Sequence, residues 1–339
     1  MAILKLFPNQ DDIKKYVPTI NRNMSGVTLL PSVNTAVQNF LLPYLGATFL
    51  TDIEAYLIAN THTDITEAVR DCAAWFAVYN AIPQHIITLA DMGVQQQSDN
   101  ERTSNPASEN AMKTALWHAL RTGYDKLEYL LWDVLSPQKA TLPNWAAYQG
   151  SAIVCDRLLY SPDEFQRWQP LRNNGAMEAW LDLRPAMLNA EDLYLRPILC
   201  DELIDELKTQ RCSNTITPAN KILLDKVNRY LAAKTIIISN AQNQTRHTGR
   251  GAKVTGIQDP LHPSTDTNYE NLETSYQTNQ TIANIAELQL LNFLKANADT
   301  YPLWRDSPCN TTTTPEPTPT TDCCDPCATP KTNKSLLTI

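Results

Sequence analysis

The chain has 339 residues, which is enough for about two domains of ordinary size. Hydrophobic residues make up 43% of it, the share of a globular protein, so disorder over the whole chain is excluded. The formal net charge of −8 argues against the broad basic surface that nucleic-acid binding needs, and nine glycines disfavour glycine-rich phosphate loops.

The sequence predicts a cytosolic protein without an export signal. The opening MAILKLFPNQDDIKKY has an apolar run too short for a signal sequence, and acidic residues follow it at once. No stretch approaches the roughly 20 apolar residues that a transmembrane helix requires. Cys72, Cys155, Cys200 and Cys212 lie in helical or apolar contexts, so we expect them to be reduced core cysteines.

The first half of the chain opens with two proline-marked helical segments. A short helix is expected from Asp11 and Asp12, whose negative charges suit a helix N-terminus. In residues 31–58, Pro31 suits a helix start, and Pro43 stands about three turns later, where proline removes a backbone hydrogen bond. This segment should therefore form two helices, or one helix with a sharp kink.

Two longer helices follow, separated by a polar stretch. Residues 68–82, AVRDCAAWFAVYNAI, are apolar nearly all round, which predicts a helix buried on several sides. The polar residues 91–110 are a long interruption for a compact domain unless the loop has a role. The last helix, 112–135, carries apolar residues at helical spacing: Met112, Leu116, Leu120, Leu127, Leu131 and Val134.

The second half repeats this order. Ser161 can cap a helix, Pro162 fits its first position and Glu164 completes a capping box. A paired-proline segment follows at 185–210, then a helix at 219–238 with a polar stripe, and a polar stretch at 239–280. The final apolar spacing runs through Ile282, Ile285, Leu288, Leu291 and Leu294.

A shift of 154 residues aligns the paired-proline segments of the two halves, and the shift drifts by a few residues elsewhere, as loop insertions would cause. It places PSVNTAVQNFLLPYLGATFLTDIE, residues 31–54, on PAMLNAEDLYLRPILCDELIDELK, residues 185–208, with matching prolines and apolar positions. Amphipathic helices can resemble one another by convergence, but matching prolines favour a duplication. We therefore predict a mainly α-helical protein of two tandem copies that superpose, with long loops between helices. The predicted bounds are residues 1–150 and 151–305, with Pro43 over Pro197 and Phe76 over Tyr230.

A tail and its cysteines complete the chain. Threonine and proline dominate from Ser307 onward, so residues 306–339 are predicted to be disordered and to pack on nothing. Four cysteines there could supply thiolates to one metal, but no second paired arm and no nearby histidine accompany them. Adventitious cysteines are favoured, and intermolecular disulfides are the next option. These residues are Cys309, Cys323, Cys324 and Cys327.

No catalytic or metal-binding constellation emerges, so we expect neither an enzyme nor a cofactor. Histidines do not share a helix face at metal-ligand spacing, and Gly249–Lys253 resembles a phosphate loop only superficially. Acidic pairs such as Asp163 and Glu164 fall near helix N-termini, which accounts for them. The seven tryptophans mostly follow core spacing, but Trp145 and Trp304, beside prolines at the copy ends, are candidate interface anchors. The histidines are His62, His85, His118, His247 and His262.

One stretch of copy 2 resembles a known family. Asp163-Glu164-Phe165-Gln166-Arg167-Trp168-Gln169-Pro170-Leu171, followed by Leu183-Arg184-Pro185 and Leu195-Arg196-Pro197-Ile198-Leu199-Cys200, resembles a helical family of tailed phages and prophages of gut anaerobes. Copy 1 carries Leu42-Pro43-Tyr44-Leu45-Gly46, and Cys200 replaces that glycine in copy 2. The helix order is also similar to phage head–tail connector adaptors, which assemble as rings below the portal. These motifs are structural, so the resemblance implies no active site.

The resemblance implies a non-enzymatic structural or assembly protein, a phage head–tail connector component found in the virion after assembly in the bacterial cytoplasm. Its partners would be further copies of itself and virion proteins such as a portal, with no membrane and no direct nucleic-acid contact. The alternative is a soluble, cytoplasmic bacterial protein-binding or scaffold module. We expect the contacts to come from the loops 91–110 and 239–280 and from Trp145 and Trp304, because the helices bury their apolar faces within each copy.

Overall fold

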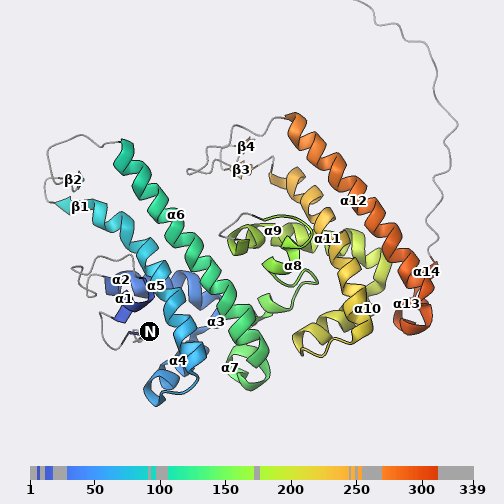
Figure 1. Cartoon of the computed structure of the whole chain (residues 1–339), viewed down its shortest axis with the longest axis horizontal. Coiled ribbons are helices and arrows are strands. Elements are labelled where there is room, and N and C mark those ends of the chain that lie inside the picture. The colour runs from blue at the N-terminus through green and yellow to red at the C-terminus, as the bar shows by residue number, and fades with distance from the viewer. Residues whose placement is uncertain are drawn as a thin grey trace, which may run out of the picture.

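A computed structural model of the chain describes residues 6–7, 12–17, 29–90, 93–96, 106–171, 176–243, 246–248, 251–253 and 269–311. Within these ranges the fold is mainly α-helical, as the sequence predicts. The two copies lie side by side, copy 1 in the blue and green half of Figure 1 and copy 2 in the yellow and orange half.

Copy 1 consists of short helices packed around one end of a pair of long helices. The elements in order are α1 (Ile13–Tyr16), α2 (Leu30–Ala36), the π-helix η3 (Val37–Leu41), α3 (Leu42–Leu45), α4 (Ala47–Ala59), α5 (Thr63–Ile86), β1 (Ile87–Ala90), β2 (Gly93–Gln96), α6 (Pro106–Glu128), the π-helix η4 (Tyr129–Leu135), the 3-10 helix η5 (Ser136–Thr141) and α7 (Pro143–Ala146).

Copy 2 has the same order after a connecting 3-10 helix, η6 (Gln149–Val154). Its elements are α8 (Pro162–Gln166), α9 (Ala176–Ala190), the π-helix η7 (Glu191–Leu195), α10 (Arg196–Cys212), α11 (Pro218–Asn243), β3 (Arg246–Thr248), β4 (Gly251–Lys253), α12 (Tyr269–Ala296), the 3-10 helix η8 (Ala298–Thr300), α13 (Pro302–Arg305) and α14 (Pro308–Thr311).

The two copies share three backbone irregularities at equivalent positions. A π-helix occupies residues 37–41 and, 154 residues later, 191–195. Positive φ angles recur at the same shift, at Gly46 (75°) and Cys200 (60°), and at Asn60 (52°) and Asn214 (54°). Because these irregularities do not follow from amphipathic patterning, they confirm a duplication and exclude convergent helix patterns.

The two helices expected in each paired-proline segment are present, but the prolines do not separate them. Each π-helix instead leads into the proline: the Leu42 N–H donates to the carbonyl of Val37, five residues back, and Pro43 continues the helix as α3. The break comes at Gly46 and at Cys200. A Cβ at Gly46 would lie 2.7 Å from the ring of Tyr148, so copy 1 requires glycine there.

The long helices are paired within each copy, α5 with α6 and α11 with α12. An antiparallel two-stranded hairpin follows the first helix of each pair, β1 with β2 and β3 with β4. The polar stretches between the long helices are shorter than predicted. The helix α11 continues to Asn243, α12 begins at Tyr269 and α6 begins at Pro106. Other parts of both predicted loops lie outside the described residues.

One continuous apolar core runs through both copies. The predicted apolar helix in copy 1 is buried as expected: Val69, Cys72 and Phe76 have no exposed surface. The copies join where α6 packs against α9, and the rings of Trp132 and Trp180 meet edge to face with centroids 5.3 Å apart. Copy 2 is therefore packed onto copy 1 and not merely tethered to it.

The cysteines and the start of the tail differ from expectation. Cys72 is reduced and buried, but Cys155 is bonded to Cys212 and Cys200 to Cys309. The prediction that the tail packs on nothing from residue 306 is wrong for its first residues, because α14 contacts α10. Because Cys309 is bonded to Cys200, its thiolate is not available as a metal ligand. Cys323, Cys324 and Cys327, with the rest of residues 312–339, lie outside the described residues.

Candidate functional site

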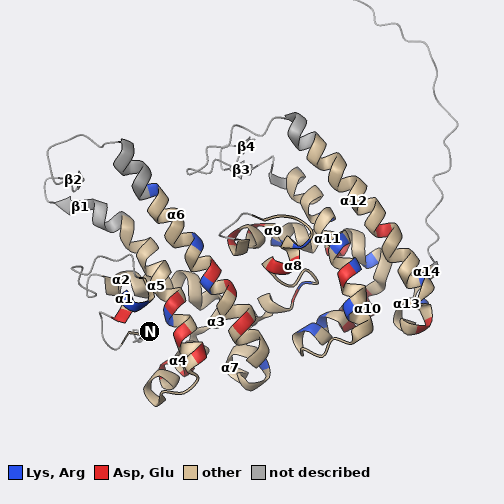
Figure 2. Ribbon diagram, viewed as in Figure 1, with Lys and Arg blue, Asp and Glu red and all other residues tan. Residues whose placement is uncertain are grey.

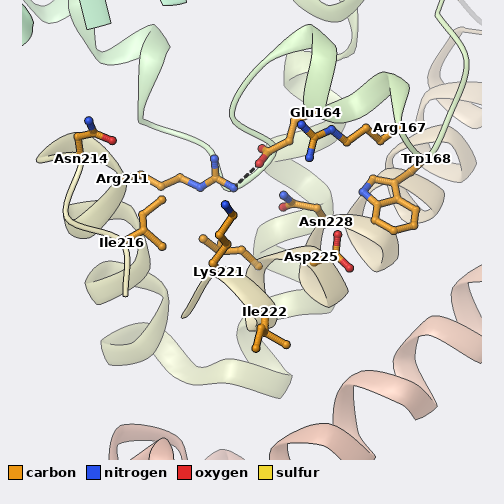
Figure 3. A pocket seen from close by; sticks show the side chains of 11 residues that line it. Glu164, Arg167, Trp168, Arg211, Asn214, Ile216, Lys221, Ile222, Asp225 and Asn228 are labelled. Atoms are coloured by element: carbon orange, nitrogen blue, oxygen red, sulfur yellow. Dashed lines mark hydrogen bonds and ion pairs between the residues drawn. The ribbon is translucent and has the colours of Figure 1, made fainter. Parts of the chain in front are cut away.

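The candidate site is a pocket of about 600 Å³ in copy 2, formed by α8, the C-terminal end of α10 with its following loop, and the first turns of α11 (Figure 3). Charged and amide side chains cover one part of its wall, and apolar side chains cover the rest. The lining residues are Glu164, Arg167, Trp168, Arg211, Asn214, Ile216, Lys221, Ile222, Leu224, Asp225 and Asn228.

An ion pair fixes the inner end of this pocket. The Arg211 side chain is only 4% exposed, and its Nη2 donates to Glu164 Oε1 at 2.8 Å. Glu164 is held in turn by the predicted helix start, because its own N–H donates to the Ser161 hydroxyl. The second Glu164 oxygen accepts from the Tyr160 N–H, one residue earlier than a standard capping box. Both groups are therefore rigidly placed.

Two buried polar atoms at the pocket have no hydrogen-bond partner among the residues that the structure describes. These are Nε of Arg211 and Oδ1 of Asn228, and Asn228 is only 2% exposed. An unsatisfied buried polar group costs about 1–3 kcal/mol, so native structures contain few of them. In Figure 3 the Asn228 amide lies between the Arg211–Glu164 pair and Trp168.

The pocket mouth is cationic, although the chain as a whole is acidic. Arg167 and Lys221 are exposed, and neither forms an ion pair with any residue that the structure describes. In Figure 3 the Lys221 ammonium points toward the Arg211–Glu164 pair. Three cations thus face two carboxylates, Glu164 and Asp225. Elsewhere basic and acidic residues are interspersed along the described helices that Figure 2 shows.

Copy 1 provides an internal comparison for these residues. The 154-residue shift places Leu57 at the position of Arg211, Glu67 at Lys221 and Ala74 at Asn228. In copy 1 the carboxylate of Glu67 already has partners within the same copy. It accepts from the Tyr16 hydroxyl at 2.5 Å and forms an ion pair with Arg70 at 2.9 Å. The polar pocket is therefore a specialisation of copy 2 and not a requirement of the fold.

A second feature is the acidic junction between the copies. Burial raises the pKa of Glu128, on α6, to about 8, and the carboxylates of Asp163, Asp125 and Asp133 add to the shift. Glu128 is therefore largely protonated at neutral pH. Since its folded pKa lies above the ordinary value of 4.5, its stabilising contribution is complete below about pH 4.5 and is lost as pH rises through about 8.

We expect Glu128→Gln to remove this pH dependence. The variant should match the parent near pH 5 and exceed it at pH 9, by on the order of 1–2 kcal/mol once partial exposure is discounted. Urea unfolding at the two pH values measures this difference. Asp133→Asn, which changes an exposed carboxylate nearby, is the control and should change the pH dependence much less. Parallel pH profiles for Glu128→Gln and the parent would contradict the assignment.

Trp145 and Trp304 are not interface anchors, contrary to the prediction from their positions. They are 0% and 2% exposed, and each indole N–H donates to a backbone carbonyl, Trp145 to Tyr44 and Trp304 to Ile198. Those carbonyls are again 154 residues apart. The two tryptophans are therefore equivalent core residues that hold α3 and α10, and they support the duplication.

Two of the histidines have described ring contacts. His62 contacts Tyr56 and His118 contacts Trp75, while His262 lies outside the described residues. In the part of the chain that the structure describes, no three histidine, cysteine or acidic side chains are grouped to hold a metal ion. No described helix is both long and apolar enough to span a membrane.

Sequence comparison finds the same repeat independently. The profile of one family, described as "Family of unknown function (DUF6712)", matches residues 35–151 and again residues 195–314. Both matched segments contain corresponding elements, from α3 and α10, which follow the π-helices, to the tryptophan-bearing helices α7 and α13. No curated protein matches the chain, and no solved structure matches it.

Proposed function

Because the chain belongs to the DUF6712 family and carries that family's domain twice, we propose that it is a non-enzymatic assembly protein that associates with further copies of itself, as a component of a phage head–tail connector. The observation that carries the proposal is the contact between the two copies. In this contact α6 of copy 1 meets α9 of copy 2, so two equivalent domains use different surfaces. The same contact can therefore form again between copy 2 of one chain and copy 1 of the next.

The surface available for such a repeat is the outer side of α12. In copy 1, α6 packs against α5 and also against α9 of copy 2. Its counterpart α12 packs against α11 but lies at the edge of the part of the molecule that the structure describes, where no further copy is set against it (Figure 1). Leu288 and Ile285 are 62% and 46% exposed on α12 and, three residues apart, share one side of the helix.

The alignment of the last helices supports this assignment. A shift of 163 residues places Gly123 on Ala286, Leu127 on Leu290 and Leu131 on Leu294, and all six are buried. At that shift the exposed Leu288 replaces Asp125 of copy 1. Copy 2 therefore bears an apolar residue where copy 1 bears a charge, as expected if a second chain covers α12.

The occupant that we propose is copy 1 of another chain, set against α12 as copy 2 is set against α6. Such head-to-tail contacts generate a closed ring when the rotation between chains closes, and a filament otherwise. A head–tail connector requires the closed ring and not the filament. The β-hairpins at the tips of both long helix pairs lie toward the same end of the molecule in Figure 1, where neighbouring virion proteins such as a portal would meet both.

We expect Leu288→Glu to weaken self-association by roughly 30-fold, because a charge would have to be buried in the contact at a cost of about 2 kcal/mol. Sedimentation velocity of the full chain measures this change. Ile58→Glu introduces the same charge at a side chain that is 88% exposed on α4. In the contact between the copies, α10, the counterpart of α4, does not pack substantially against the described residues of α6, so this variant should leave association unchanged. Equal effects of both variants would contradict the proposed surface.

Two observations test the connector assignment separately. Electron micrographs of the purified chain, alone and mixed with the portal protein encoded nearest to its gene, should show rings. Portal, capsid and terminase genes beside this one would be expected as well. Discrete non-ring complexes with a host protein would instead favour the alternative, a bacterial scaffold module.

A further inference from the structure

The copy 2 pocket contains polar groups that the fold does not need. Copy 1 builds the same helices with Leu57 and Ala74 where copy 2 has Arg211 and Asn228. Keeping these groups buried with Nε of Arg211 and Oδ1 of Asn228 unpaired opposes folding. A ligand that supplies the missing partners would offset this cost, and no described side chain does so.

We propose that this pocket binds the carboxylate of an acidic residue presented on a peptide segment of a partner protein. This goes beyond the self-association proposed above, because the pocket lies on α8, α10 and α11 and does not include α12. The proposal therefore stands or falls independently of the head-to-tail contact.

The carboxylate is indicated by the donors at the pocket. Lys221 and Arg167 are cations without an ion-pair partner among the described residues, and Nε of Arg211 is a buried donor without an acceptor. Glu164 already neutralises part of Arg211 through the 2.8 Å pair, so a single additional negative charge suits the pocket better than a dianion such as phosphate. The formal charges of the lining, three positive against two negative, agree with this.

The peptide is indicated by the remaining wall. Oδ1 of Asn228 requires a donor, which a backbone N–H supplies and a bare carboxylate does not. Ile216, Ile222 and Leu224 provide an apolar surface beside it, and Ile222 is 55% exposed. A volume of about 600 Å³ accommodates an acidic side chain together with the adjoining backbone and part of a neighbouring apolar residue.

The test uses acetyl-leucyl-glutamyl-leucine amide, its glutaminyl counterpart, N-acetylglutamate and inorganic phosphate, titrated into the full chain by calorimetry. The glutamyl peptide should bind at least about tenfold more tightly than the glutaminyl peptide, since one charge-assisted contact of about 1.5–3 kcal/mol is lost. It should also bind more tightly than N-acetylglutamate and phosphate. Equal or tighter binding of either small anion would overturn the peptide assignment.

The variants convert the pocket to the residues of copy 1. Lys221→Glu and Asn228→Ala should each weaken binding of the glutamyl peptide, the first by about tenfold or more. Lys226→Glu makes the same charge change on the same helix, where the ammonium lies over the ring of Phe293, and should preserve binding. Since Asn228→Ala removes an unpaired buried group, its melting temperature should not fall, so lost binding would not reflect unfolding. No binding of the glutamyl peptide to the parent, or unchanged binding in both pocket variants, would overturn the proposal.

Discussion

Replacing Trp304 by alanine is expected to destabilise the chain by about 3–5 kcal/mol, the cost of removing a large, fully packed aromatic side chain from a core. Trp304 is 2% exposed, and its indole N–H donates to the Ile198 carbonyl at 2.9 Å. The substitution therefore opens a cavity and leaves that carbonyl unpaired, just before the backbone break at Cys200. Urea unfolding monitored by circular dichroism measures the loss.

The control for this change is the preceding residue. Leu303 is 41% exposed on the same short helix, α13, so Leu303→Ala should cost far less. Trp145→Ala should reproduce the large effect, since Trp145 makes the equivalent contact with Tyr44 in copy 1. Comparable small losses for Trp304→Ala and Leu303→Ala would contradict the role of the tryptophan as a core residue.

Cys309→Ser is expected to lower the free energy of unfolding by about 2–4 kcal/mol. The Cys200–Cys309 bond closes a loop with a sequence separation of 109 residues and holds α14 against α10. Its loss raises the conformational entropy of the unfolded chain and so favours unfolding. Thermal unfolding with and without a reductant measures the effect. Reductant should lower the melting temperature of the parent more than that of the variant, in which Cys155–Cys212 is the remaining disulfide among the described residues.

A matched substitution separates the disulfide from the change of atom. Cys327→Ser alters sulfur to oxygen at a residue beyond the described part of the chain and should leave the melting temperature and its response to reductant unchanged. If Cys309→Ser behaves in the same way, the disulfide does not stabilise the fold.

Much of the fold could be predicted from local sequence chemistry. The capping residues Ser161 and Glu164 mark the start of α8, and the prolines and apolar spacing around Pro43 and Pro197 reveal the duplication. The disulfides could not be predicted, because pairing depends on which segments meet in space: Cys155 and Cys212 lie 57 residues apart, with their Cα atoms at 5.1 Å. The π-helices η3 and η7, which precede Pro43 and Pro197, likewise leave no simple periodic signal.

The pocket was missed because its residues are ordinary when read one at a time. Arg211 and Asn228 stand on amphipathic helices, where a polar residue is normally assigned to the solvent side. The signal that could have revealed them is the comparison between copies, since Leu57 and Ala74 show that both positions are apolar in copy 1. A charged or amide residue that replaces an apolar counterpart at a repeat position is therefore a useful indicator of a specialised site.

The disulfides give the two halves different requirements during synthesis. Both bonds are confined to residues 155–309, and Cys72, in copy 1, is reduced. Copy 1 therefore needs no oxidant to form disulfides of its own. Copy 2 can form its Cys200–Cys309 bond only after Cys309, 109 residues beyond Cys200, has been synthesised, so covalent closure of the second half is a late step.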